Sequence, residues 1–408
     1  MRMLRLASLL ALGSLLLLKT DRAAAADDFP LKDGDIWVMA GDSITAQKQH
    51  SNYFEAFCFA RYPNMKFAFR NSGVGGHTIP TTLARFDYDI AAWNPTVVSV
   101  ELGMNDKGGT VTEKFVQNMG TMVGRIREIK ARPVILSASP VNNGETMQNL
   151  GQNKRLSEYG VALKEFSAKE KIPYANQFHA LVDVWGKNFA AKGVSMQGDA
   201  VHPGPPGQLM MANALLKALG AKEFVSSVTI TGEGKVDAKG CAISDVKVTD
   251  GLIAFDRLDE CVPSPIPDAA RAVVDFDPTI LEMSQYMLKA TGLKPASYTL
   301  KINGVVTATL TAKQLEAGVN LTAFGPIDKA KDVNPIVAQG RAILKAVADK
   351  EAIVGQWRAL SKKAIAKDAP AELKTELAAL TKKVEEADVK IREAAKVQKL
   401  HFELSPAQ

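Results

Sequence analysis

The chain of 408 residues is 46% hydrophobic and 23% charged, which is ordinary for a globular protein and sufficient for two or three domains. Its formal net charge is +6, of which residues 1–26 carry +3 through four basic side chains and one acidic one, so about +3 is left for the rest. That charge is small, and no basic stripe interleaved with aromatic residues occurs, which argues against a nucleic-acid partner.

Residues 1–26 have the composition of an export signal. Arginines at positions 2 and 5 precede an apolar run from Leu6 to Leu18, and four alanines at 23–26 offer a cleavage site. The run is shorter than the roughly 20 residues that a membrane-spanning helix needs, and no later run reaches that length. The sequence therefore predicts a secreted or periplasmic protein that has lost residues 1–26 and has no transmembrane segment.

Residues 27–222 alternate between strand-like and helix-like runs. Short apolar runs predict strands over residues 35–40, 65–71, 96–102, 133–137 and 173–175. Longer segments between them predict helices over residues 51–61, 81–92, 112–130, 153–171, 179–191 and 206–219. Because strands alternate with helices, we expect an α/β domain with a parallel sheet covered by helices on both faces. Asp87 and Asp89 are predicted to be solvated charges on their helix.

The sequence changes character after about Gly220. Residues 223–325 contain short β-rich runs, with a hairpin signal in which two alternating runs flank Asn303-Gly304. Residues 326–408 are rich in Ala, Lys, Glu and Leu and are predicted to be a helical C-terminal segment. Cys58 is expected to be a buried thiol, whereas Cys241 and Cys261 form either a disulfide or two free thiols.

Ser43, Gly76 and Asn105 lie where strands of the first domain end, and Asp199 and His202 lie in a loop before its last helix. Ser43 follows the first strand, and the carboxyl ends of parallel strands meet at one edge of a sheet, where ligands bind. Acyl transfer by serine needs a base, a group that orients the base, and donors for the oxyanion. We assign His202 as the base and Asp199, three residues earlier, as its partner. The backbone N–H of Gly76 and the side-chain amide of Asn105 are the candidate oxyanion donors.

These stretches resemble the SGNH (GDSL) hydrolase family, esterase or acetylesterase type. The resemblance is carried, in the family's order, by Gly41-Asp42-Ser43-Ile44, Asn71-x-Gly73-x-x-Gly76-x-Thr78, Glu101-Leu102-Gly103-Met104-Asn105-Asp106 and Asp199-x-x-His202-Pro203. It implies a three-layer α/β/α sandwich over residues 27–222, catalysis by a Ser-His-Asp triad, a backbone N–H of Ser43 in the oxyanion hole, and no cofactor or metal. The sequence departs at His77, where relatives often have Asp; this residue is either an ordinary loop histidine or a substrate contact.

The resemblance implies a serine esterase that removes acyl groups, and most commonly acetyl groups on carbohydrates, from oxygen esters. The expected partner is therefore a small-molecule or polysaccharide ester. A lysophospholipase or lipase-type esterase and an O-acyltransferase would use the same residues. A protein that binds carbohydrate through the β-rich module, with a secondary SGNH domain, is the third alternative.

Overall fold

The structure is a computed structural model that describes residues 29–141, 150–191, 196, 198–249, 251–326 and 333–407. The predicted export signal at residues 1–26 lies outside these described residues. Within them, no helix combines the length and the apolar character that crossing a membrane requires.

The first domain is built on a five-stranded parallel sheet with the order β2-β1-β3-β4-β5. Its strands are β1 (Asp35–Gly41), β2 (Phe67–Gly73), β3 (Val97–Glu101), β4 (Arg132–Leu136) and β5 (Tyr174–Ala175). The helices around it are α1 (Ser43–Ala46), α2 (His50–Arg61), α3 (Ile79–Leu83), α4 (Phe86–Asp89), α5 (Thr112–Glu128), α6 (Leu150–Glu170), α7 (Gln177–Ala191) and α8 (Pro205–Ala218).

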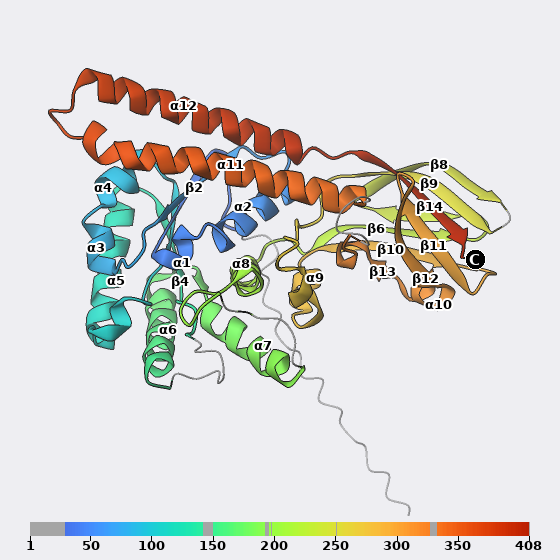
Figure 1. Ribbon diagram of the computed structural model, residues 1–408, viewed down its shortest axis with the longest axis horizontal. Coiled ribbons are helices and arrows are strands. Elements are labelled where there is room, and N and C mark those ends of the chain that lie inside the picture. Colours follow the sequence, from blue (N-terminus) through green and yellow to red (C-terminus); the bar gives the residue numbers. More distant parts are fainter. Residues whose placement is uncertain are drawn as a thin grey trace, which may run out of the picture.

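Side chains of β1 show why both faces of this sheet must be covered. Trp37 and Met39 pack into a core with α2 and α8, whereas Val38 and Ala40 pack into a second core with α5 and α6. Successive side chains of a strand point to opposite faces, so a strand apolar at every position needs helices on both sides. Figure 1 shows the resulting layers. The predicted α/β/α sandwich is confirmed.

The predicted helix over residues 81–92 is divided into α3, α4 and the 3-10 turn η1 (Ala91–Trp93). The break lies at Arg85, which leaves helical geometry and whose buried side chain pairs with Asp89. Asp89 is only 3% exposed, so the prediction that it is solvated is wrong. A carboxylate can be buried there because it is paired with two arginines, Arg85 and Arg358.

Two further sheets follow the first domain. One has the order β13-β10-β6-β7 and the other the order β12-β11-β14-β9-β8. The strands are β6 (Phe224–Thr231), β7 (Val236–Lys239), β8 (Cys241–Thr249), β9 (Leu252–Asp259), β10 (Gln285–Thr291), β11 (Ser297–Ile302), β12 (Val305–Thr311), β13 (Val319–Asn320) and β14 (Lys399–Pro406). Shorter elements between them are the 3-10 turns η3 (Arg271–Asp275) and η4 (Leu321–Ala323) and the helices α9 (Thr279–Glu282) and α10 (Ala312–Ala317). The two sheets share one apolar core.

The hairpin at Asn303-Gly304 is present between β11 and β12. The predicted helical segment 326–408, in contrast, ends in the strand β14, which pairs with β9 and β11. Its alternation explains the difference, because Leu400, Phe402 and Leu404 are all buried in the core that the two sheets share. All three cysteines are free, so Cys241 and Cys261 do not form a disulfide.

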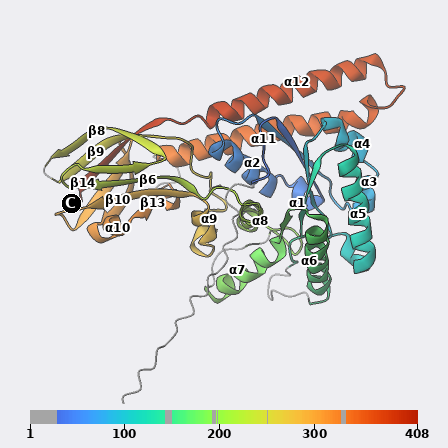
Figure 2. The ribbon, with the colours of Figure 1, turned by 180° about the vertical axis from the view of Figure 1, so that it is seen from behind.

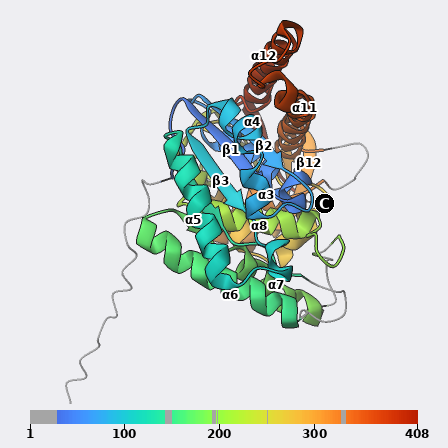
Figure 3. The same cartoon turned by 90° about the vertical axis from the view of Figure 1, so that its left-hand side faces the viewer.

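Helices α11 (Pro335–Ala364) and α12 (Ala371–Ala394) run antiparallel along the first domain, beside its edge strand β2 (Figures 1, 2 and 3). Trp357 of α11 stacks on Trp93, with their ring centroids 3.6 Å apart. The fully buried Lys350 donates to Glu55 Oε2 at 2.9 Å. The C-terminal helices thus contribute side chains to the cores on both faces of the parallel sheet.

Candidate active site

Ser43 lies at the carboxyl edge of the parallel sheet, as the first residue of α1. Asp42 caps this helix, since its Oδ1 accepts a hydrogen bond from the Ile44 N–H at 2.9 Å. The turn from β1 into α1 is tight, because a Cβ at Gly41 would lie 2.0 Å, and one at Gly73 2.3 Å, from atoms of α1. Glycine at these two positions therefore allows the close approach that holds the serine at the edge of the sheet.

Ser43, His202 and Asp199 form a continuous hydrogen-bonded series. Ser43 Oγ lies 2.8 Å from His202 Nε2, and His202 Nδ1 lies 2.8 Å from Asp199 Oδ2. The backbone N–H groups of His202 and Val201 also donate to Asp199 Oδ1, at 2.8 Å each. These two amides, His202 first, and then the imidazole lower the pKa of Asp199 to about 2. Asp199 is therefore ionised at neutral pH and orients the ring so that Nε2 faces the serine.

The two other predicted site residues, Gly76 and Asn105, lie at the same carboxyl edge of the sheet as Ser43. Gly76 has a φ of +76°, which suits glycine, and a Cβ on the preceding Gly75 would lie 3.9 Å from Ser43 Cβ. The Gly75-Gly76 loop therefore runs beside the serine. Asn105 Nδ2 donates to the His77 carbonyl at 3.1 Å and lies 3.4 Å from Asp42 Oδ2. The structure thus brings all five predicted site residues together.

Two buried carboxyl groups lie beneath this site. Burial raises the pKa of Asp42, which is fully buried, to about 6. Burial, and then the charge of Asp42, raise the pKa of Glu101 well above its usual range. Glu101 accepts a hydrogen bond from Thr45 Oγ1 at 3.0 Å, and its second oxygen has no partner among the described residues. Burial thus favours the neutral form of Glu101, which avoids a second negative charge beside Asp42.

The loop that carries His202 is attached to α8 and α2 through Gln208, which the sequence reasoning missed. Gln208 Nε2 donates to the Pro203 carbonyl at 3.2 Å, and its Oε1 accepts from the His50 N–H at 2.9 Å. His50 Nδ1 lies 3.0 Å from the same oxygen, and burial lowers the pKa of His50 to about 4. His50 is thus a neutral structural histidine. The signal available in the sequence was a glutamine beside apolar residues near the start of α8.

His77 is held by a buried arginine. Arg85 Nε donates to His77 Nδ1 at 3.2 Å, and partial burial and the charge of Arg85 lower the pKa of His77. His77 therefore carries its proton on Nε2. The backbone carbonyl of His77 accepts a hydrogen bond from Asn105, one of the candidate oxyanion donors. His77 therefore has a structural role beside these donors.

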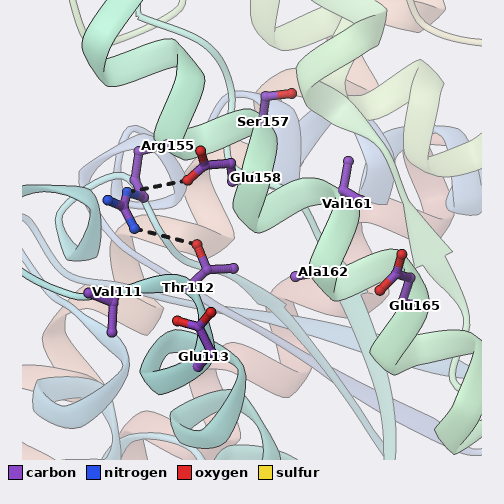
Figure 4. A pocket seen from close by; sticks show the side chains of 9 residues that line it. All are labelled: Val111, Thr112, Glu113, Arg155, Ser157, Glu158, Val161, Ala162 and Glu165. Atoms are coloured by element: carbon purple, nitrogen blue, oxygen red, sulfur yellow. Dashed lines mark hydrogen bonds and ion pairs between the residues drawn. The ribbon is translucent and has the colours of Figure 1, made fainter.

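A shallow groove of about 550 Å³ lies elsewhere, between the first turn of α5 and the side of α6 (Figure 4). In it, Arg155 pairs with Glu158 and donates to Thr112, while Val161 is exposed. Its lining includes none of the triad residues, so this groove is not the candidate active site. The candidate site is identified by the hydrogen bonds among Ser43, His202 and Asp199. The described residues contain no group of three or more His, Cys, Asp or Glu side chains that could hold a metal ion.

Residues 39–209 match the GDSL-like Lipase/Acylhydrolase family. This region belongs to that family. The predicted membership is confirmed, and the protein is a hydrolase that acts on ester bonds. Over 170 residues the chain is 23% identical to an acetylxylan esterase of Geobacillus stearothermophilus, an alignment that covers 40% of this chain and 76% of that protein.

Among solved structures, a gut microbial diltiazem-metabolizing enzyme superposes with a TM-score of 0.75 at 23% identity, covering 93% of this chain and 99% of that one. That enzyme shares the fold of nearly the whole chain, including the appended sheets and helices. An acetylxylan esterase structure from Geobacillus stearothermophilus matches with a TM-score of 0.42 at 19% identity, covering 47% of this chain and 97% of that one.

Proposed function

We propose that the protein is an exported serine esterase that hydrolyses acetyl oxygen esters, with carbohydrate acetates as its substrate class. The observation that carries the mechanism is the 2.8 Å contact between Ser43 Oγ and His202 Nε2, with Asp199 2.8 Å from the other ring nitrogen. Export is supported by the signal-like composition of residues 1–26.

In this mechanism Ser43 Oγ attacks the acyl carbon while its proton moves to His202 Nε2. Ionised Asp199 stabilises the imidazolium that forms. The oxyanion receives hydrogen bonds from the N–H groups of Ser43 and Gly76 and from the Asn105 amide. His202 then donates its proton to the leaving alcohol, and water, activated by the same histidine, releases the acyl group from the serine.

The substrate class is supported by the relatives. The curated relative is named an acetylxylan esterase, and the solved structure that shares the fold of nearly the whole chain is named a diltiazem-metabolizing enzyme. The first name is consistent with an acetyl group on a carbohydrate. Acyl transfer to a sugar hydroxyl would use the same three residues, with the acceptor hydroxyl replacing water.

A substrate panel with the purified chain tests this proposal. Nitrophenyl esters of increasing acyl length, diltiazem, lysophospholipid and acetylated xylan should be compared by acetate or acyl release, with Ser43→Ala as the blank. We expect the acetate esters to be turned over fastest. Faster release of long acyl chains would contradict the acetyl assignment, and appearance of the acetyl group on an added sugar in place of free acetate would make the enzyme a transferase. Binding of xylan without any turnover would favour a carbohydrate-binding protein.

A further inference from the structure

An arginine of the C-terminal helix α11 reaches the strand that leads into the glycine loop of the site. Arg358 Nη1 donates to the carbonyl of Gly73, the last residue of β2, at 2.9 Å. Its Nε and Nη2 donate to the two oxygens of Asp89, at 2.6 Å and 2.7 Å. The chain runs from Gly73 directly to Gly76, so Arg358 fixes the backbone at the start of the oxyanion loop.

Asp89 also binds a second arginine, Arg85. It accepts from Arg85 Nη1 as well as from Arg358, and Ser72 Oγ donates to it at 3.0 Å. Burial alone would raise the pKa of Asp89, but the hydrogen bonds and charge of Arg358, followed by the charge of Arg85, lower it. The carboxylate is thus ionised and held between two guanidinium groups.

Arg85 links Asp89 and Arg358 to the candidate active site by hydrogen bonds. Its Nε donates to His77 Nδ1 at 3.2 Å, and its Nη2 donates to the carbonyl of Gly41, two residues before Ser43, at 3.3 Å. The His77 carbonyl in turn accepts from Asn105 Nδ2 at 3.1 Å. Each step is a hydrogen bond, so the series is continuous from α11 to the proposed oxyanion donor.

Among the residues that the structure describes, loss of Arg358 would leave Arg85 as the only cation paired with the buried Asp89. Arg85 Nη1 already bonds Asp89 Oδ2, whereas Oδ1 would lose its hydrogen bond from Arg358 Nε. A buried carboxylate oxygen without a partner is costly, so the Arg85 guanidinium would turn toward Oδ1. Its bonds to His77 and to the Gly41 carbonyl would then lengthen. Small displacements of catalytic groups have large kinetic effects.

We propose that Arg358 is a positioning residue for catalysis, which holds the loop of residues 73–78 and, through Asp89, Arg85 and His77, the oxyanion donors. The inference rests on the proposed function, since it takes Gly76 and Asn105 as those donors. It makes the C-terminal helices part of the esterase machinery, although they lie outside the family domain of residues 39–209.

Arg392 of α12 provides a matched control. Its Nη2 donates to the carbonyl of Phe67, the first residue of β2, at 2.5 Å, and its guanidinium stacks on Phe59 and Phe67. It therefore attaches the same C-terminal helices to the same strand, but at the end away from Ser43. Arg392→Ala should lower the melting temperature and leave kcat unchanged.

The test compares Arg358→Ala, Arg358→Lys and Arg392→Ala in the full chain with nitrophenyl acetate. Reactive serine is titrated first with a fluorophosphonate, so that kcat refers to folded sites only. We expect Arg358→Ala to lower kcat roughly 10- to 100-fold with little change in KM, because oxyanion donors act on charge that develops in the transition state. Millimolar methylguanidinium should restore part of the loss in this variant and none in Arg392→Ala. Arg358→Lys keeps the charge but cannot make all three hydrogen bonds, so its kcat should lie between those of Arg358→Ala and the wild type.

Equal kcat per titrated site in the Arg358 variants and Arg392→Ala would overturn the inference. If Arg358→Ala does not fold, a wild-type kcat in Arg358→Lys has the same consequence. Failure of the proposed function is recognised separately, because the wild-type protein would then keep its activity after Ser43→Ala or show none at all.

Discussion

Removing the C-terminal half should unfold the first domain, even though residues 27–222 contain the whole proposed triad. Truncation after residue 222 deletes Lys350, Arg358 and Asp388, which pair with Glu55, Asp89 and Arg70 of the first domain at 2.9, 2.6 and 2.7 Å. The three remaining partners are buried, with side chains at most 5% exposed.

Removing one partner of a buried ion pair costs roughly 3–5 kcal/mol. Asp89 keeps Arg85 as a partner, whereas Glu55 and Arg70 each lose their ion pair. Two such losses come to about 6–10 kcal/mol, which is comparable to the total stability of about 5–15 kcal/mol of a typical domain. The truncation also uncovers apolar surface, since Ile343, Val347 and Trp357 pack into the cores of the first domain. Stability should therefore be lost even where Glu55 or Asp89 takes up a proton to avoid a buried charge.

The assay is expression of residues 27–222 beside the chain 27–408, followed by far-UV circular dichroism melting and hydrolysis of nitrophenyl acetate. We expect the shorter chain to be insoluble or to melt without a cooperative transition, and to be inactive. A soluble fragment that melts cooperatively and keeps the kcat of the longer chain would refute the reasoning, and would show that the first domain is stable without α11 and α12.

Three further substitutions test individual residues. Asn105→Ala should lower kcat by roughly 10²–10³ with little change in KM, as loss of one oxyanion donor does; an effect on KM alone would assign Asn105 to substrate binding. Asp199→Asn should lower kcat less than His202→Ala does, because the amide can still accept from the backbone N–H groups of the loop; the reverse order would contradict the assigned roles. Asp42→Asn should remove a pH-dependent cost. The pKa of Asp42 is about 6 in the folded state against 3.8 in the unfolded state, so the folded state binds the proton more tightly and the contribution of Asp42 to stability falls as pH rises from about 4 to 6. Relative to the wild type, the variant should therefore gain on the order of 3 kcal/mol between pH 4 and pH 7 in urea unfolding; a constant difference would show that Asp42 does not titrate there.

The parallel sandwich could be predicted from the sequence because its signals are local. Apolar runs alternate with amphipathic segments over residues 35–219, and the motifs that contain Ser43, Gly76 and Asn105 follow strands. The structure brings Ser43, Asp199 and His202 into hydrogen-bond contact, while their catalytic roles stay predictions until kinetics test them.

What the sequence reasoning missed depends on contacts between distant residues. Asp89 looked solvated because an i,i+4 pair such as Arg85–Asp89 is ordinary on an exposed helix, and its second partner, Arg358, is 269 positions away. The strand β14 was hidden by the helical composition that precedes it, although Leu400, Phe402 and Leu404 alternate with polar residues as a half-buried strand does. The attachment of α11 to the first domain likewise follows from tertiary packing, which local propensity does not encode.

The most direct test of the account is the hydrolysis of nitrophenyl acetate by the full-length chain and by Ser43→Ala, measured at equal concentrations of folded protein. Ser43 is a small, half-buried residue that contributes little packing, so its replacement by alanine should leave the melting temperature nearly unchanged. We predict that kcat falls by several orders of magnitude, as it does when a triad nucleophile is removed. A folded Ser43→Ala protein with near wild-type turnover would contradict the assignment of Ser43 as the nucleophile.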